Sequence, residues 1–302
     1  METIFIKSPK DIKRDISNLG LVLGYFDGVH IGHAQLINYA KSNTRKGSLG
    51  VLSFDRALKS IEGSLIDISD KEKEMEKLGV DYLFIIICTD QFKHLTYEEF
   101  TNSYLKAFSP AKLFCGADFK FGYGAKGDVS YLKSRFNEVY VLNYVLDHNE
   151  NKVSSTNIKE LIKEGNVEEA DRYLGKPYKI KGGVIHGLNN GKIINFPTAN
   201  LLPSTDYVIP SNGVYFTKTI IDDATYISVT NIGVHPTVDK LERPTIETFV
   251  IDYDGDLYGK SIGILFFKKE RDEEQFGSLE ELKNKIDSDI INAEHYFKYK
   301  AK

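Results

Sequence analysis

The sequence predicts two domains: an α/β half with a doubly wound parallel sheet, then a small antiparallel β-barrel with a C-terminal helix. Through residues 1–177, apolar runs alternate with helical patterns, as in a parallel sheet whose strands are linked by helices. Within 178–302, short strands of alternating polarity follow one another without helices, which is typical of a small barrel. An amphipathic pattern over 278–299 then predicts a last helix.

Length and composition agree with two ordinary globular domains. The chain has 302 residues, of which 41% are hydrophobic and 27% charged, as in folded rather than disordered proteins. Its net charge of −4 gives no reason to expect a nucleic acid or an anionic membrane as partner. Because the sequence also lacks a membrane-span pattern and a signal-peptide pattern, we predict a cytoplasmic protein that acts on small molecules.

The two cysteines are predicted to be structural. Cys88 ends one apolar run and Cys115 lies in another, so both are expected to be packed as small hydrophobic residues. We expect no disulfide between them, because cytoplasmic thiols are kept reduced. Neither cysteine belongs to a Cys/His cluster with the spacing of a zinc site.

Apolar runs and capping residues define the elements of the first half. Gly79 is a suitable C-terminal cap for a charged helix, and Thr96 a suitable N-terminal cap for the next one. The strands are predicted at 1–6, 19–23, 49–54, 82–88, 112–115 and 139–142, and the helices at 34–41, 68–78, 96–108 and 158–174.

The stretch Gly24-Tyr-Phe-Asp-Gly-Val-His-Ile-Gly-His33, hereafter the signature loop, links a predicted strand to the helix after it. A glycine-rich turn at such a place directs backbone N–H groups and the positive helix end at one point, which suits a phosphate. His30 and His33 are three residues apart and share a face on a helix, where two imidazoles can donate to a phosphoryl oxygen. The alternative is a turn whose glycines only permit tight packing.

The signature loop resembles the H-x-G-H motif of the nucleotidyltransferase superfamily, in the form typical of bacterial riboflavin kinase/FAD synthetases. This resemblance implies that His30 and His33 are catalytic in the transfer of AMP from ATP to FMN. It also implies nucleotide contacts from Gly24, Phe26, Asp27, Gly28 and Gly32.

The segment 116–128 combines glycines with aromatic residues, which suits a mobile loop that lays a ring against a planar ligand. A solvated surface loop is the alternative. Its Asp118-Phe-Lys-Phe-Gly122 resembles the segment near the flavin in the adenylyltransferase half of the family. The resemblance implies flavin contacts from Asp118, Phe119 and Phe121.

Ser155 and Thr156 stand at the predicted start of a helix, where hydroxyl groups commonly cap the helix itself. With Lys159 they resemble a Ser-Ser-Thr-x-x-Arg motif, which implies that all three contact the ATP phosphates. Lysine lacks the bidentate fork of arginine, so a weaker grip is expected here. A second departure is Phe54-Asp-Arg-Ala-Leu58, where the family usually has Phe-Asp-Pro-His-Pro.

In the second half, Ser278 is expected to cap the last helix, with Glu281 completing a capping box. Turn signals lie at Asn189-Asn-Gly191 and Asp252-Tyr-Asp-Gly255. The strands are predicted at 180–186, 213–221, 226–231, 245–252 and 261–268, and the apolar helix face consists of Leu279, Leu282, Ile286, Ile290 and Ala293.

Phe196-Pro-Thr-Ala-Asn-Leu201 places Thr198 and Asn200 two residues apart on an extended segment, so that both share one face. Their oxygens are hard ligands that suit Mg²⁺ and a nucleotide phosphate, and the segment resembles the Pro-Thr-Ala-Asn motif of riboflavin kinases. One departure is Asn195, where the family usually has glycine. The glycine-spaced hairpin before it is by itself a weak phosphate-loop signal, and we assign nucleotide contacts to Gly182, Gly187 and Gly191.

Glu247 stands between Ile246 and Thr248 in a weakly charged strand. Phosphorylation of a primary hydroxyl needs a base, and the position of Glu247 matches the catalytic glutamate of the family; an outward-facing strand glutamate is the alternative. Arg271 lies in a segment that also follows the family's order, which implies a flavin contact.

The resemblance extends from the signature loop to the last helix and implies a bifunctional flavin enzyme. The barrel half would phosphorylate riboflavin to FMN, and the α/β half would adenylylate FMN to FAD, with ATP as co-substrate and Mg²⁺. Two alternatives stay open. The departures leave one half inactive, or the chain is a catalytically silent regulator that binds flavin or nucleotide in the same pockets.

Overall fold

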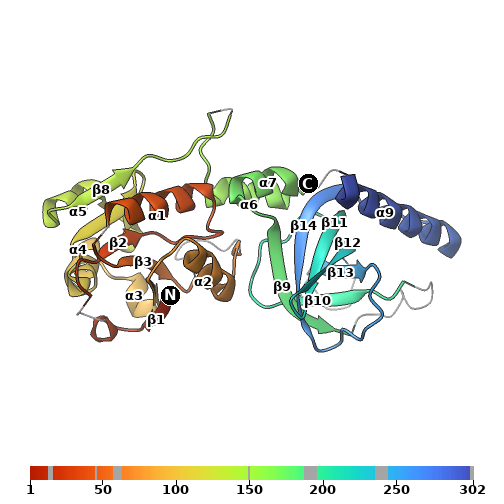
Figure 1. Cartoon of the computed structure of the whole chain (residues 1–302), viewed down its shortest axis with the longest axis horizontal. Coiled ribbons are helices and arrows are strands. Elements are labelled where there is room, and N and C mark those ends of the chain that lie inside the picture. Colours follow the sequence, from red (N-terminus) through yellow and green to blue (C-terminus); the bar gives the residue numbers. More distant parts are fainter. Residues whose placement is uncertain are drawn as a thin grey trace. The chain divides into compact units, whose positions relative to one another are not determined.

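The fold is known from a computed structural model that describes residues 1–12, 16–44, 46–56, 63–148, 150–186, 196–234 and 244–299. The chain divides into two compact units, Met1–Ser155 and Thr156–Lys302, each with its own sheet (Figure 1). The predicted succession of an α/β half and a barrel half is confirmed. This division follows the first residue of α6 (Ser155–Lys163), whereas the boundary that we predicted at 177/178 from the change in sequence texture follows α7 (Val167–Leu174).

The first unit contains a six-stranded sheet in the order β1-β4-β3-β2-β5-β8, and every neighbouring pair is parallel. From β2 the chain builds outward to β3 on one side and later to β5 on the other, so the topological switch point lies between β2 and β5. Ligands of open α/β sheets bind beyond the carboxyl ends of the strands at such a point. The strands are β1 (Glu2–Ile6), β2 (Gly20–Leu23), β3 (Leu49–Phe54), β4 (Tyr82–Ile86), β5 (Lys112–Gly116) and β8 (Val139–Leu142).

Both faces of this sheet are buried, as predicted for a doubly wound fold. Leu21 and Val22 of β2 point to opposite faces and belong to different core clusters. The cluster of Val22 includes Ile37 and Met75 of the helices α1 and α2. That of Leu21 includes residues of α3, α4 and α5. These helices are α1 (Ile31–Asn43), α2 (Ile68–Lys77), α3 (Asp90–Lys93), α4 (Tyr97–Ser103) and α5 (Val129–Arg135).

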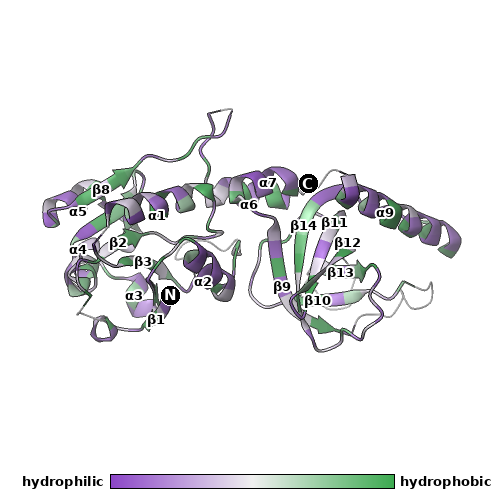
Figure 2. Cartoon of the chain, in the orientation of Figure 1, coloured by the Kyte–Doolittle hydropathy of each residue, from purple (hydrophilic) through white to green (hydrophobic). Residues whose placement is uncertain are grey.

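Hydropathy follows this layering, with the strands of the parallel sheet hydrophobic and the outer faces of α2 and α9 hydrophilic (Figure 2). Cys88 and Cys115 are both buried and carry free thiols, as predicted. Within the described ranges, no helix combines the length and the apolar character that crossing a membrane requires.

The single helix predicted over 96–108 is two elements. Thr96 caps α4 in a capping box with Glu99, but the α-helix ends at Ser103 and a 3₁₀ helix, η2 (Leu105–Phe108), follows. Between the two lies Tyr104, a buried residue whose ring packs against Phe92 and Phe100.

The helix predicted over 158–174 is also two helices, α6 (Ser155–Lys163) and α7 (Val167–Leu174). Gly165 separates them with a left-handed φ of 82°, a conformation that favours glycine. Asn166 then caps α7 by accepting a hydrogen bond from the backbone N–H of Glu169 at 3.4 Å. Helix α7 packs against β9 and β14 of the barrel.

The second unit is a closed barrel of antiparallel strands in the order β10-β13-β12-β11-β14-β9, and pairing of β9 with β10 closes it. The five predicted strands are confirmed. β10 was predicted only as an extended segment, because it is short and lies between Pro197 and Pro203, and proline is rare inside strands. The strands are β9 (Tyr178–Ile185), β10 (Ala199–Pro203), β11 (Gly213–Ile221), β12 (Ala224–Val234), β13 (Pro244–Val250) and β14 (Ser261–Arg271).

A chain of hydroxyl groups crosses the barrel interior. Five fully buried side chains, Thr219, Ser228, Thr217, Thr230 and Thr248, are joined in that order by hydrogen bonds of 2.8–2.9 Å. A buried polar network of this kind specifies one arrangement of its strands, because a broken partner leaves a desolvated hydroxyl. It therefore helps to fix the register of β11, β12 and β13.

The last helix, α9 (Leu279–Tyr299), packs on β12. Ser278 caps it as predicted, accepting from the N–H of Glu281 at 3.2 Å. The predicted apolar face is wrong at its start, because the Leu279 side chain is 61% exposed. Ala293, nearer the other end, is fully buried, so the apolar contact of this helix with the barrel lies toward its C-terminal part.

The remaining short elements lie in the first unit: η1 (Pro9–Asp11), β6 (Lys120–Phe121), η3 (Tyr123–Ala125) and β7 (Gly127–Asp128). β6 and β7 form a two-stranded sheet. The segment predicted as a mobile aromatic loop thus contains regular structure.

Candidate functional site

His30 and His33 lie at the start of α1, beyond the carboxyl end of β2. His30 is the N-terminal cap rather than a helical residue, and its Nδ1 accepts a hydrogen bond from the backbone N–H of His33 at 3.3 Å. An acceptor at Nδ1 fixes the neutral tautomer with the proton on Nε2, which is then a donor. The two rings stack with centroids 3.6 Å apart, so the two imidazoles lie side by side although only His33 belongs to the helix.

The backbone of the signature loop is strained. Phe26, Gly28 and Val29 have φ values of 55°, 80° and 46°, and the left-handed region is costly for the two residues with side chains, at about 1–3 kcal/mol each. A Cβ on Gly24 would lie 2.9 Å from the Phe26 ring, so any larger residue there would displace that ring. The loop is therefore more than a tight turn: surrounding contacts have to hold it in this form.

Asp27 supplies part of that support. Its carboxylate is buried, and one oxygen accepts from the N–H of Leu65 at 2.8 Å and from the hydroxyl of Ser64 at 3.0 Å. The Asp27 carbonyl accepts from the Ser155 hydroxyl at 3.0 Å. None of these three contacts follows from sequence spacing, because the partners lie 37 to 128 residues away.

From the sequence, Ser155 was predicted either to cap its own helix or to contact phosphate. The bond from its hydroxyl to the Asp27 carbonyl is a third role, which links the start of α6 to the signature loop. Thr156, the next residue, is exposed on α6, whereas the Lys159 side chain is only 5% exposed.

Gly32 lies in the first turn of α1, where a Cβ would come within 3.2 Å of the His30 ring. Small size at that position keeps the histidine ring in place.

The predicted flavin residues differ in accessibility. Asp118 is largely exposed and forms an ion pair with Lys152. Phe119 is partly buried and stacks on Phe121, with ring centroids 5.5 Å apart. Phe121 is itself in the core, where its ring packs against Phe100. Of the two aromatic residues, Phe119 thus has the more accessible ring.

Asp55 belongs to the segment Phe54-Asp-Arg-Ala-Leu58, which departs from the family pattern. Burial acts to raise its pKa, but the N–H of Cys88 and the Arg56 guanidinium outweigh this and lower it below the usual value. The bond from Cys88 is 2.9 Å long and ties the end of β3 to that of β4. Residues 57 and 58 of this segment lie outside the described ranges.

The barrel register aligns the residues of the predicted kinase site. Asn200 of β10 pairs with Glu247 of β13, which pairs on its other side with Asn231 of β12. We call these three residues the polar row. Ile246 and Thr248 are buried inside the barrel while Glu247 is half-buried, so the polar row lies on the outer face of the barrel. Thr198 is two residues before Asn200 in the sequence. Asn231 was not singled out from the sequence, since only the pairing of strands brings it beside Glu247.

Gly182 of β9 is explained by packing: a Cβ there would collide with the Leu202 carbonyl of β10. Gly187 and Gly191, predicted to contact nucleotide, and Asn195 lie outside the described residues.

The guanidinium of Arg271, predicted to contact flavin, binds the buried carboxylate of Asp289 through Nε at 3.1 Å and Nη2 at 2.8 Å. It thereby joins β14 to α9.

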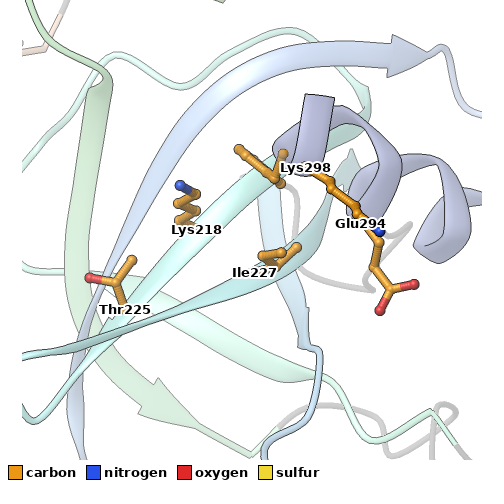
Figure 3. A pocket seen from close by; sticks show the side chains of 6 residues that line it. Lys218, Thr225, Ile227, Glu294 and Lys298 are labelled. Carbon is orange, nitrogen blue, oxygen red and sulfur yellow. The ribbon is translucent and has the colours of Figure 1, made fainter. Parts of the chain in front are cut away.

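A hollow beside α9 is separate from these residues (Figure 3). It lies over β11 and β12 and is lined by Lys218, Thr225, Ile227, Glu294, Phe297 and Lys298. The ammonium of Lys218 is 4.8 Å from the centre of the Phe297 ring. The hollow contains none of the predicted site residues.

Two family models match successive parts of the chain. The model described as FAD synthetase covers residues 12–157 and the one described as riboflavin kinase covers 174–297. The first contains the signature loop with its stacked histidines, and the second contains the polar row.

Full-length relatives agree with this order. The chain is 34% identical to a bifunctional riboflavin kinase/FMN adenylyltransferase of Listeria monocytogenes, over 98% of both chains. It is 33% identical to a protein of the same name from Bacillus subtilis, over 98% of both. A crystal structure described as a macrolide-efflux protein from Streptococcus pneumoniae has a TM-score of 0.89 at 32% identity, covering 97% of this chain and 99% of that one. The chain belongs to the bifunctional riboflavin kinase/FMN adenylyltransferase family and is an enzyme of flavin cofactor biosynthesis.

Proposed function

We propose that this chain catalyses both reactions for which its relatives are named, each in its own unit. The barrel half phosphorylates riboflavin to FMN, and the α/β half converts FMN and ATP to FAD and pyrophosphate. One observation carries the proposal: the signature loop with its stacked histidines and the polar row each stand on the unit that matches the corresponding family model.

In adenylyl transfer, a phosphate oxygen of FMN attacks the α-phosphorus of ATP, and the bond to pyrophosphate breaks. Negative charge grows on the α-phosphate oxygens during this step. The Nε2–H of His30, the adjacent His33 and the N–H groups at the start of α1 supply donors for that charge. Gly24, Phe26, Asp27, Gly28 and Gly32 shape the backbone that the nucleotide approaches.

Further residues contact the nucleotide and the flavin. Thr156 and Lys159 contact ATP phosphates, while Ser155 acts through the Asp27 carbonyl. Phe119 lies against the flavin ring and Asp118 is near it, whereas the buried Phe121 supports Phe119 from behind.

In riboflavin phosphorylation, the primary hydroxyl of the substrate attacks the γ-phosphorus of ATP, and ADP leaves. Glu247 takes the hydroxyl proton, which makes the oxygen a better nucleophile. Asn200 and Asn231 flank the carboxylate on both sides, so the substrate hydroxyl meets three polar groups in one line.

Thr198 and Asn200 fit a magnesium ion. Within the described ranges, no group of three or more His, Cys, Asp or Glu side chains is placed to hold a metal, so a dedicated all-protein cage is not the form to expect. Mg²⁺ instead retains several waters and binds through few protein oxygens together with nucleotide phosphates, and the hydroxyl of Thr198 and the amide oxygen of Asn200 suit that role. When bound, such an ion neutralises phosphate charge.

The protein acts on small molecules alone and is located in the cytoplasm, in agreement with two free, buried thiols. The functional boundary lies near residue 177, close to the start of the segment that the riboflavin kinase model covers.

Incubation of the pure protein with riboflavin, ATP and Mg²⁺, followed by separation of the flavins, tests the proposed function. FAD is the expected product, and an excess of EDTA should stop both reactions. FMN alone would indicate a kinase with an inactive α/β half. FAD formed only from supplied FMN would indicate the reverse, and bound but unchanged flavin would indicate a regulator.

A further inference from the structure

Lys71 of α2 is a buried cation beneath the signature loop. Its side chain is 3% exposed, which is rare for lysine. The ammonium donates to the carbonyl of Tyr25 at 2.9 Å and to the hydroxyl of Ser53 at 3.1 Å. It also lies 4.6 Å from the centre of the Tyr25 ring. All of these partners are neutral.

A buried ammonium is expensive when no ion pair compensates its lost hydration. Within the described part of the chain, Lys71 makes no salt bridge, and the charged or titratable groups near it are Asp27, Asp55 and Cys88. Burial lowers the pKa of Lys71 to about 8, although these three groups act to raise it. Methionine or leucine would fill the same space at lower cost, so the lysine calls for a reason.

The Tyr25 carbonyl indicates that reason. It accepts a second hydrogen bond from the Ser53 hydroxyl at 2.7 Å, so two donors, from β3 and from α2, converge on one oxygen. Tyr25 immediately precedes Phe26, the first left-handed residue of the strained turn. Strained backbone of this kind persists only where neighbouring groups over-determine it.

We propose that Lys71 is a positioning residue for adenylyl transfer: its ammonium holds the Tyr25 carbonyl and thereby the turn that carries His30 and His33. This inference rests on the proposed function of the α/β half. Lys71 acts through the backbone of the loop. Asp27, by its bonds to Ser64 and Leu65, holds the other side of the same turn.

The test compares Lys71→Met with Lys73→Met, a control on the exposed face of the same helix. For Lys71→Met, kcat for FAD formation from supplied FMN should fall by about 10- to 100-fold, because small misplacements of reacting groups have effects of that size. KM values for ATP and FMN should change less than kcat. FMN formation by the barrel half should be unchanged and reports on folding of the chain. Lys73→Met should leave both activities unchanged.

Two further measurements distinguish positioning from simple packing. In the parent, FAD formation should decline as the pH rises through about 8, since the neutral amine is a weaker donor and loses its attraction to the Tyr25 ring. Lys71→Met should lack that decline. Ser53→Ala, which removes the second donor to the same carbonyl, should lower FAD formation in the same direction by a smaller factor.

A Lys71→Met variant that forms FAD within about threefold of the parent rate, with the parent's pH profile, would overturn the inference; this threshold lies well below the expected loss. Equal loss of FMN and FAD formation would also overturn it, because the lysine would then support folding in general. A parent protein that makes no FAD from supplied FMN would instead contradict the proposed function, and the inference with it.

Discussion

The two units place the polar residues of their proposed sites by different structural means. In the α/β half, His30 and His33 are placed by an irregular turn with left-handed residues, which distant side chains hold in shape. In the barrel half, Asn200, Glu247 and Asn231 are placed by regular strand pairing alone. The first site depends on backbone conformation and the second on register.

This difference determines how each site can fail. A register slip of one residue would turn the polar row toward the barrel interior, and the buried hydroxyl chain opposes such a slip. In the signature loop, loss of one supporting contact would let a strained turn relax without disturbing the sheet. Substitutions should therefore separate the two activities cleanly.

The largest effect is expected at Glu247. Glu247→Gln keeps the shape of the side chain but cannot accept a proton, so FMN formation should fall by about 10²- to 10⁴-fold, the range of general-base catalysis. FAD formation from supplied FMN should continue, and Glu280→Gln on the exposed side of α9 is the matched control. Phosphorylation within a few-fold of the parent rate would exclude Glu247 as the base.

His30→Ala and His33→Ala should each lower FAD formation by about 10²-fold or more, as when one transition-state donor is removed. FMN formation should not change, because it takes place in the barrel half. His94→Ala, elsewhere in the same unit, serves as the control. An equal loss of both activities in the His30 and His33 variants would point to misfolding and contradict the assigned roles.

Two fragments test whether the barrel unit is independent. Since α7 packs on β9 and β14 and buries Tyr173 and Leu174, a fragment beginning at Thr156 should fold and make FMN. One that begins at Lys176 lacks the whole of α7, including these two side chains, and should be less stable by at least about 3 kcal/mol. Urea denaturation of both measures the difference. Equal stabilities would mean that α7 is not part of the barrel unit.

The smallest effect concerns Asp171, whose carboxylate accepts from the N–H of Tyr178 at 2.7 Å. Burial, and secondarily the charge of Glu168, raise its pKa from 3.8 to about 8. The stability that the protonated group contributes is therefore fully present below pH 4 and is lost as the pH rises through 8. Relative to the parent, Asp171→Asn should therefore gain Tm as the pH rises from 5 to 9, by about 2–4 °C for each kcal/mol of stability that the parent loses. A difference independent of pH would contradict the raised pKa.

Much of the fold could be predicted because its signals are local. Each strand of the parallel sheet is an apolar run, and five barrel strands alternate in polarity. The strand–turn–helix geometry of the signature loop also follows from its own residues. The division between α6 and α7 also had a local signal. Gly165 is a suitable helix end, and Asn166 with two glutamates soon after it is a suitable helix start. We predicted one helix because the apolar residues over 158–174 keep helical spacing across this point.

The rest of the site depends on contacts between residues far apart in the sequence. Lys71 and Ser53 donate hydrogen bonds to the Tyr25 carbonyl from 46 and 28 residues away. The sequence around these two residues does not predict either bond. Asn231 joins the polar row only through barrel pairing. The bond from the Arg271 guanidinium to the buried carboxylate of Asp289, eighteen residues later, was likewise not predicted from the sequence.

The central claim, that two independent sites act in sequence, is tested most directly by mixing two inactive variants. Glu247→Gln and His30→Ala are each incubated with riboflavin, ATP and Mg²⁺, alone and together, and FAD is measured. Each alone should make little or no FAD, because the first lacks FMN and the second cannot adenylylate it. The mixture should make FAD, since FMN released by one protein is adenylylated by the other. A mixture that forms no FAD while FMN accumulates would contradict the account.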